Sequence, residues 1–311
     1  QLKTARLEAD RLSAETYIFI EEQILPDLDW PTFSELLRKS REKWSKPPIL
    51  YTDIFPALVC QAAGGDPLRA VPLAAAWLLN ILAGRIFDDW QDGDGMQQGW
   101  MRNGATDAVP MGLFALGAGN AALSRLEVEQ QTLADIFRAF GNILALSAKA
   151  QTAKLDLQHV TVERYFAHIA AKTGIVFATA AWAGARTVES GALAATVDAL
   201  YDFGMNLGMA IQIADDCEDI GASDLGQQHF TLPLVFALSK ENHPQHPRLV
   251  SLLENGSHPK WVEDVTNLLE DMGAIEWSLR VASIYRAKAL TALEPLPQAN
   301  VSTLVAYTVG Q

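Results

Sequence analysis

Two short acidic sequences carry the clearest chemistry in this chain. Asp88-Asp89-Trp90-Gln91-Asp92 is the first, Asp215-Asp216-Cys217-Glu218-Asp219 is the second, and both read D-D-x-x-D. Residues four apart share one face of a helix, so each sequence stacks carboxylates that repel one another. Carboxylate oxygens without His or Cys suit hard cations, and Mg²⁺ usually joins one or two carboxylates to a substrate phosphate. The pattern therefore predicts a magnesium site that binds a phosphorylated substrate.

The six aspartates have graded roles in this interpretation. Asp88, Asp92 and Asp215 are the leading metal ligands, and Asp219 completes the candidate metal set. Asp89 and Asp216 are expected to reach the metal through water or to orient its ligands. This is also the alternative role of Asp219. A solvated acidic helix end is the alternative explanation for one such sequence alone. Two matched sequences favour the metal site.

Helical periodicity dominates the segments that position these aspartates. Apolar runs lead into both motifs, and they predict helices from about Leu68 to Asp92 and over 192–220. No strand alternation or hairpin signal occurs. One all-α domain over 1–311 is the simplest organisation, with the motifs facing each other across a bundle cavity. Further helices are predicted near 2–25, 32–44, 50–63, 105–124, 127–156, 161–185, 230–240, 247–255, 259–272, 274–294 and from Val301.

Composition narrows the class of protein. The chain has 311 residues, of which 49% are hydrophobic, and a formal net charge of −13. A large core is therefore expected, and the acidic balance argues against nucleic acid or anionic membrane surfaces as partners. Two cysteines, Cys60 and Cys217, form neither a disulfide framework nor a cysteine-rich zinc site. No apolar run is expected to span a bilayer, so a cytoplasmic protein that is not integral to the membrane is predicted.

From about Pro48 to Tyr307 the chain resembles the trans-isoprenyl diphosphate synthase, or polyprenyl synthetase, family of the isoprenoid synthase superfamily. The apolar lead-in PLAAAWLLNILAGRIFDD ends in the first motif, and LGMAIQIADDCEDI contains the second, with Gln212 three residues before the Asp pair. Tyr165 followed by Ala171-Lys172-Thr173-Gly174 resembles the family's Lys-Thr motif. Thr231-Leu232-Pro233 matches its Thr-Leu-Pro.

The resemblance implies an isoprenoid synthase-type helical bundle around a deep central cavity. It further implies three Mg²⁺ ions, held by the two Asp motifs, that bind an allylic prenyl diphosphate and help the diphosphate leave to give an allylic cation. A homodimer is also implied. The residues expected at the diphosphate are Lys172, Thr173, Gln212 and His229. A surface lysine, a helix-packing amide and a capping histidine are the alternatives for Lys172, Gln212 and His229.

Small residues before the first motif imply, by the same resemblance, a cavity deep enough for a chain of about C15–C20 or longer. Ala83 and Gly84 are those residues, and Phe87 and Phe177 are candidate wall aromatics. Ordinary helix packing is the alternative for all four.

Several basic residues that the family uses for isopentenyl diphosphate are missing. Its Gly-Lys-Arg-x-Arg-Pro stretch is only echoed at Lys43-Trp44-Ser45-Lys46-Pro47, its Arg-Arg-Gly is Gln97-Gln98-Gly99, and its Gly-Lys is Gln228-His229. Replacing Arg with Gln removes a fixed charge and a bidentate fork.

The leading hypothesis is therefore a terpene-synthase-like enzyme that cyclises its cation, eliminates a proton or captures water. One alternative is a prenyltransferase that elongates the allylic diphosphate with isopentenyl diphosphate through other basic residues, and the candidates are Lys43, Lys46, Arg102 and His229. Transfer to a different acceptor and a non-catalytic partner subunit remain further alternatives.

Overall fold

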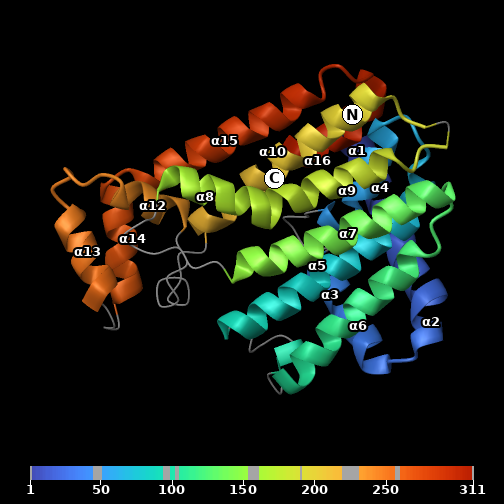
Figure 1. Cartoon of the computed structure of the whole chain (residues 1–311), viewed down its shortest axis with the longest axis horizontal. Helices are drawn as coiled ribbons and strands as arrows, with labels where there is room; N and C mark the ends of the chain where they lie inside the picture. The colour runs from blue at the N-terminus through green and yellow to red at the C-terminus, as the bar shows by residue number, and fades with distance from the viewer. Residues whose placement is uncertain are drawn as a thin grey trace. The chain divides into compact units, whose positions relative to one another are not determined.

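The computed structural model describes residues 2–44, 51–93, 99–101, 105–152, 161–189, 191–218, 231–255 and 260–309. These residues form helices and their connecting turns and contain no strand, which confirms the all-α fold. Figure 1 shows the helices of the chain, and the contacts between residues divide it into two compact units. Unit 1 contains Gln1–Gly141, Thr179–Asp202 and Ala292–Gln311, and unit 2 contains Asn142–Ala178 and Phe203–Thr291. Whether the two behave as the single domain expected from the sequence stays a prediction.

Unit 1 is built around the helix that carries the first Asp motif. That helix, α5, begins with Pro72 in its first turn and ends where Gly93 adopts a left-handed φ of 72°, which is how helices commonly start and stop. The elements of unit 1, α5 included, are α1 (Leu2–Phe19), η1 (Ile20–Ile24), α2 (Leu25–Leu28), α3 (Pro31–Trp44), η2 (Tyr51–Ile54), α4 (Phe55–Ala62), η3 (Pro67–Ala70), α5 (Val71–Asp92), η4 (Gly99–Met101), α6 (Ala105–Leu123), α16 (Gln298–Val309) and parts of α7 (Gln130–Gln151), α9 (Ile175–Ala185) and α10 (Ala194–Glu218).

Small side chains let α5 and α6 pack closely along their length. Ala76 and Ala83 of α5 and Ala115 and Ala118 of α6 are fully buried in one apolar core. Gly112 is required at its position, because a Cβ there would lie 2.5 Å from the ring of Phe87. This packing fixes the C-terminal half of α5, and so the place of the first Asp motif within unit 1.

Unit 2 holds the second Asp motif at the end of α10. Its apolar core includes Tyr165, Met209, Ile213 and Leu232. The expected helix over 161–185 is continuous but contains one wide π turn, η5 (Ala170–Gly174). The elements of unit 2 are α8 (Val162–Ile169), η5, α12 (Leu232–Leu238), α13 (His246–Asn255), α14 (Trp261–Asp271), α15 (Ala274–Ala292) and the remaining parts of α7, α9 and α10.

Two helical stretches pass a test of length and composition for spanning a membrane. They are Pro67–Gln91 and Val162–Ala185, so the expectation that no apolar run reaches that length is wrong on this test. In the most apolar part of the first stretch, 67% of the residues are buried inside the structure, and in the second stretch the share is 44%. The core helix of a globular protein has the same properties, and the burial of α5 against α6 is of that kind.

A buried carboxyl group in unit 1 lies away from both Asp motifs in the sequence. Asp53 in η2 accepts a hydrogen bond of 2.6 Å from the Ser13 hydroxyl. The hydroxyls of Tyr17 and Tyr307, which feel the charge of Asp53, are buried without a hydrogen-bond partner among the described residues. Burial raises the pKa of Asp53, and the Ser13 hydrogen bond and the charge of Arg41 only partly oppose this.

We therefore expect Asp53→Asn to stabilise the protein at high pH only. A raised pKa in the folded state means that the stability contributed by Asp53 is present at low pH and is lost as pH rises through the folded pKa. The substitution removes the buried charge, so it should raise the melting temperature by a few degrees at about pH 8 and give little gain near pH 4, the usual range of a free carboxyl. Asp198→Asn, at an exposed site on α10, is the control. An equal shift at both pH values would contradict the expectation.

Candidate active site

The first Asp motif lies on the last turns of α5. Asp88 and Asp89 are half-buried, and Trp90 between them and the helix end is 44% exposed. Trp100 in η4 is buried in the core of unit 1, and its Nε1 donates a hydrogen bond of 2.8 Å to Oδ2 of Asp89. The second carboxylate of the motif is therefore tied to the segment that follows it.

Asp215 and Asp216 of the second Asp motif lie on the last turn of α10, and the second of these carboxylates is tied more extensively. Oδ2 of Asp216 accepts hydrogen bonds from the Tyr165 hydroxyl at 2.6 Å and from the backbone N–H of Leu232 at 3.1 Å. Oδ1 accepts one from Nε2 of Gln212 at 2.9 Å. Asp215, the preceding residue, is exposed. Asp216 therefore joins α8 and the start of α12 to the end of α10.

Burial raises the pKa of Asp216, while its three hydrogen bonds and the charge of Lys172 oppose the rise because they stabilise the carboxylate. Burial, together with the charge of Asp216, also raises the pKa of Tyr165. Tyr165 thus keeps its proton and remains the donor to Asp216.

Two residues expected at the diphosphate make hydrogen bonds within the protein. The Thr173 hydroxyl donates to Oε1 of Gln212 at 2.6 Å, which orients the Gln212 amide so that its NH₂ faces Asp216. Lys172 precedes Thr173 in the π turn η5 and is half-buried. The structure brings Lys172, Thr173, Gln212 and Asp216 together in unit 2, and their roles toward a diphosphate stay predictions.

Sequence reasoning did not identify Tyr165 and Trp100 as partners of aspartates. Tyr165 lies two helical turns before Lys172, a spacing that places residues on one face of a helix, so the sequence offered a signal for it. Trp100 follows the first motif at no regular helical spacing, and nothing in the sequence indicated its hydrogen bond.

The four cavity candidates have different surroundings. Ala83 is fully buried in the core of unit 1, and Phe87 packs against that core and beside Gly112, as expected of ordinary helix packing. Gly84 is exposed, and a Cβ there would meet no atom within 4 Å. Phe177 in α9 is buried, with its Cβ 3.2 Å from the position of a Cβ on Gly208. Their roles toward a substrate stay predictions.

Part of the predicted site lies outside the residues that the structure describes. This holds for Asp219, His229, Lys46 and Arg102, and for the side chains of Asp92 and Lys43. Among the described side chains, no group of three or more His, Cys, Asp or Glu residues is placed to hold a metal ion. The first motif belongs to unit 1 and the second to unit 2, so their opposition across a cavity stays a prediction. The oxygen-only donor set of both motifs fits Mg²⁺.

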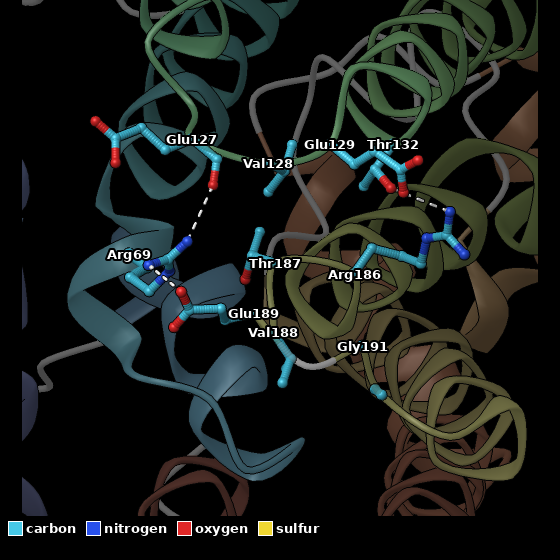
Figure 2. Close-up of a pocket in the computed structure, with 11 residues that line it drawn as sticks. Arg69, Glu127, Val128, Glu129, Thr132, Arg186, Thr187, Val188, Glu189 and Gly191 are labelled. Carbon is cyan, nitrogen blue, oxygen red and sulfur yellow. Dashed lines mark hydrogen bonds and ion pairs between the residues drawn. The ribbon is translucent and has the colours of Figure 1, made fainter.

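A separate pocket of about 580 Å³ lies in unit 1 (Figure 2). Arg69 on one wall donates to the Glu127 carbonyl at 3.3 Å and pairs with Glu189 at 3.5 Å, and Arg186 on another donates to Thr132 at 3.4 Å. Arg69 lies just before α5, whereas Asp88 lies near the other end of that helix, which is roughly 33 Å long at 1.5 Å per residue. This pocket is therefore not the place where the first Asp motif would act.

Comparisons with known proteins agree on a family. The model of the family described as Polyprenyl synthetase matches residues 86–272. A short chain isoprenyl diphosphate synthase from Methanothermobacter thermautotrophicus is 29% identical over 269 residues, which cover 80% of this chain and 81% of the relative.

Solved structures show the same fold. A geranylgeranyl pyrophosphate synthetase from Pyrococcus horikoshii matches with a TM-score of 0.78 at 22% identity, over 100% of this chain and 98% of the other. A polyprenyl synthase from Caulobacter crescentus, solved with calcium and isoprenyl diphosphate, matches with a TM-score of 0.77 at 22% identity, over 99% and 95%. The expected family and fold are thus confirmed. The relatives are named as prenyl diphosphate synthases, so elongation, the alternative from the sequence, is favoured over terpene-synthase-type cyclisation.

Close helix packing in unit 2 generates a prediction about stability. A Cβ on Gly208 of α10 would lie 2.9 Å from the Thr173 carbonyl oxygen and 3.0 Å from Cα of Gly174, so both contacts are with backbone. We expect Gly208→Ala to separate α10 from η5, to cost roughly 1–3 kcal/mol of unfolding free energy and to weaken the Thr173–Gln212 hydrogen bond. Chemical denaturation measures the cost. Gly141→Ala in α7, where a Cβ meets no atom within 4 Å, is the control and should be neutral or stabilising. Equal effects of the two substitutions would contradict this account.

Proposed function

Because the chain belongs to the polyprenyl synthetase family, we propose that it is a Mg²⁺-dependent prenyltransferase that elongates an allylic prenyl diphosphate with isopentenyl diphosphate. The observation that carries the proposal is the pair of D-D-x-x-D motifs, each at the end of a long helix, within the matched residues. The Lys172, Thr173 and Gln212 cluster beside the second motif supports it. A relative in the same fold was solved with calcium and isoprenyl diphosphate.

The proposed ligands of Mg²⁺ are Asp88, Asp92, Asp215 and Asp219, with three ions as the expected number. Bound Mg²⁺ supplies Lewis-acid stabilisation of the departing diphosphate. Lys172 contributes a positive charge close enough to Asp216 to oppose the rise that burial causes in the pKa of that carboxyl.

In the proposed reaction the allylic C–O bond breaks and diphosphate leaves with the electron pair. The double bond of isopentenyl diphosphate then forms the new C–C bond, and a proton is lost. Gln212 serves this chemistry by donating a hydrogen bond to the Asp216 carboxylate, and Thr173 serves it by orienting the Gln212 amide.

The proposed substrate is a chain of about C15–C20 or longer. Gly84 supports this length, because the space where its Cβ would stand holds no atom within 4 Å. Bulk at this position, one turn before Asp88, would fill that space. Ala83 contributes to helix packing in unit 1 rather than to open volume.

A cytoplasmic homodimer is the proposed working form. The outward side of α6 supports it, because Pro110, Leu113, Gly117 and Asn120 are exposed at helical spacing and none is charged. Leu113 is 59% exposed. Uncharged helix faces of this kind are typical of surfaces that pair with another subunit.

Labelled isopentenyl diphosphate tests the reaction. With farnesyl or geranylgeranyl diphosphate and Mg²⁺, we expect the label to appear in longer prenyl diphosphates, identified by mass spectrometry. Because Gln97, Gln98 and Gln228-His229 replace basic residues of the family pattern, we expect a higher KM for isopentenyl diphosphate than for the allylic substrate. Hydrocarbon or alcohol products that form without isopentenyl diphosphate would contradict the proposal.

Substitutions in the two motifs test whether this chain itself is catalytic. Asp88→Asn and Asp215→Asn should each lower kcat by roughly 10²-fold or more, since each removes charge that holds the metal at the departing diphosphate. Steady-state turnover of purified protein measures this, with Asp198→Asn as a matched control at an exposed aspartate. If both motif variants kept full activity, the motifs would have no part in turnover.

A further inference from the structure

We infer that Trp100 and Tyr165 are positioning residues, each of which holds the second aspartate of one motif so that the motif keeps its metal-binding arrangement. The inference rests on the proposed function, because it assigns the metal site to these motifs. It assigns no contact with substrate to either aromatic residue. The two act in different units and are argued separately.

Trp100 is built to hold Asp89. The indole is 6% exposed and packs in the core of unit 1, and its neighbour Met101 is 3% exposed. The indole N–H only donates, so its one hydrogen bond, 2.8 Å to Oδ2 of Asp89, requires an acceptor there. A buried ring with a single donor fixes both the direction and the rotamer of that carboxylate.

Tyr165 performs the same task for Asp216. The ring is 1% exposed and belongs to the core of unit 2, and its hydroxyl lies 2.6 Å from Oδ2. This distance lies at the short end of the range for O–H···O hydrogen bonds. The backbone N–H of Leu232 shares that oxygen, and Gln212 holds the other. Both oxygens of Asp216 therefore accept hydrogen bonds from the protein.

The second aspartates of the two motifs are therefore held in the same way. In each, the second aspartate accepts a hydrogen bond from a buried aromatic donor of another segment, and the first aspartate stands next to it on the same helix. Partners of this kind fix the orientation of metal-binding groups and commonly change metal affinity about 10–100-fold when removed. Asp89 and Asp216 hold the helix ends, and Asp88 and Asp215 take the metal.

Removal of the donors tests the inference: Tyr165→Phe keeps the ring, whereas Trp100→Phe also makes the ring smaller, so each is matched with the same substitution elsewhere. Trp100→Phe and Tyr165→Phe are compared with Trp182→Phe in unit 1 and Tyr285→Phe in unit 2, both of which lie outside the Asp motifs. Titration calorimetry with MgCl₂ and inorganic pyrophosphate measures metal binding without any prenyl transfer, and thermal melting without metal measures folding. We expect about 10–100-fold weaker Mg²⁺ binding in the two test variants and wild-type binding in the controls.

A double-mutant cycle separates positioning from general packing. If Tyr165 acts through Asp216, Tyr165→Phe should weaken Mg²⁺ binding in the wild type but add nothing in an Asp216→Ala background, and likewise for Trp100→Phe with Asp89→Ala. Additive effects, unchanged Mg²⁺ affinity in both test variants, or a wild type that binds no Mg²⁺ with pyrophosphate would each overturn the inference. A wild type that binds Mg²⁺ with pyrophosphate but makes no elongated product would overturn only the proposed function.

Discussion

The structure depends on keeping clustered carboxylates in order at the C-terminal ends of two helices. Aspartates on the last turns of α5 and α10 repel one another, which costs roughly 0.2–0.5 kcal/mol per pair, and also face the negative end of the helix dipole, which costs roughly 0.3–1 kcal/mol. A hydrogen bond to a charged group contributes roughly 1.5–3 kcal/mol. One well-placed donor is therefore enough to offset the cost at each helix end, and Trp100 and Tyr165 provide those donors.

At the second motif this requirement also organises segments that are far apart in the sequence. Asp216 connects the end of α10 to α8 through Tyr165 and to the start of α12 through the Leu232 N–H. The connection is possible only because Gly174 and Gly208 let η5 and α10 approach backbone to backbone. The Lys-Thr, Asp-Asp and Thr-Leu-Pro motifs therefore form one hydrogen-bonded structure in unit 2, which is a physical reason for their order in the chain.

Helical periodicity and paired acidic motifs are local signals, and they were enough to predict the all-α fold and the extents of α5 and α10. Side-chain partners were not predictable in the same way. The hydrogen bond from Thr173 to Gln212 and the contacts of Ala83 in the core depend on which helix packs alongside, and no local pattern carries that information. The terpene-synthase hypothesis failed for a related reason. Gln97 and Gln98 stand where the family pattern has arginines, and they show only a local loss of positive charge. The comparisons cover most of the chain and favour elongation.

The same charges limit how this protein could bind two diphosphates at once. Its net charge of −13 opposes any anionic ligand, and the motifs that would bind the diphosphate are themselves acidic. Among the described residues, Lys172 is the candidate cation beside the second motif, and its charge already acts on Asp216. On the proposed function, divalent metal would serve binding as well as the chemical step. Affinity for the allylic diphosphate should accordingly depend on Mg²⁺ far more steeply here than in a site that relies on fixed arginines, because an arginine fork keeps its charge whether or not metal is present.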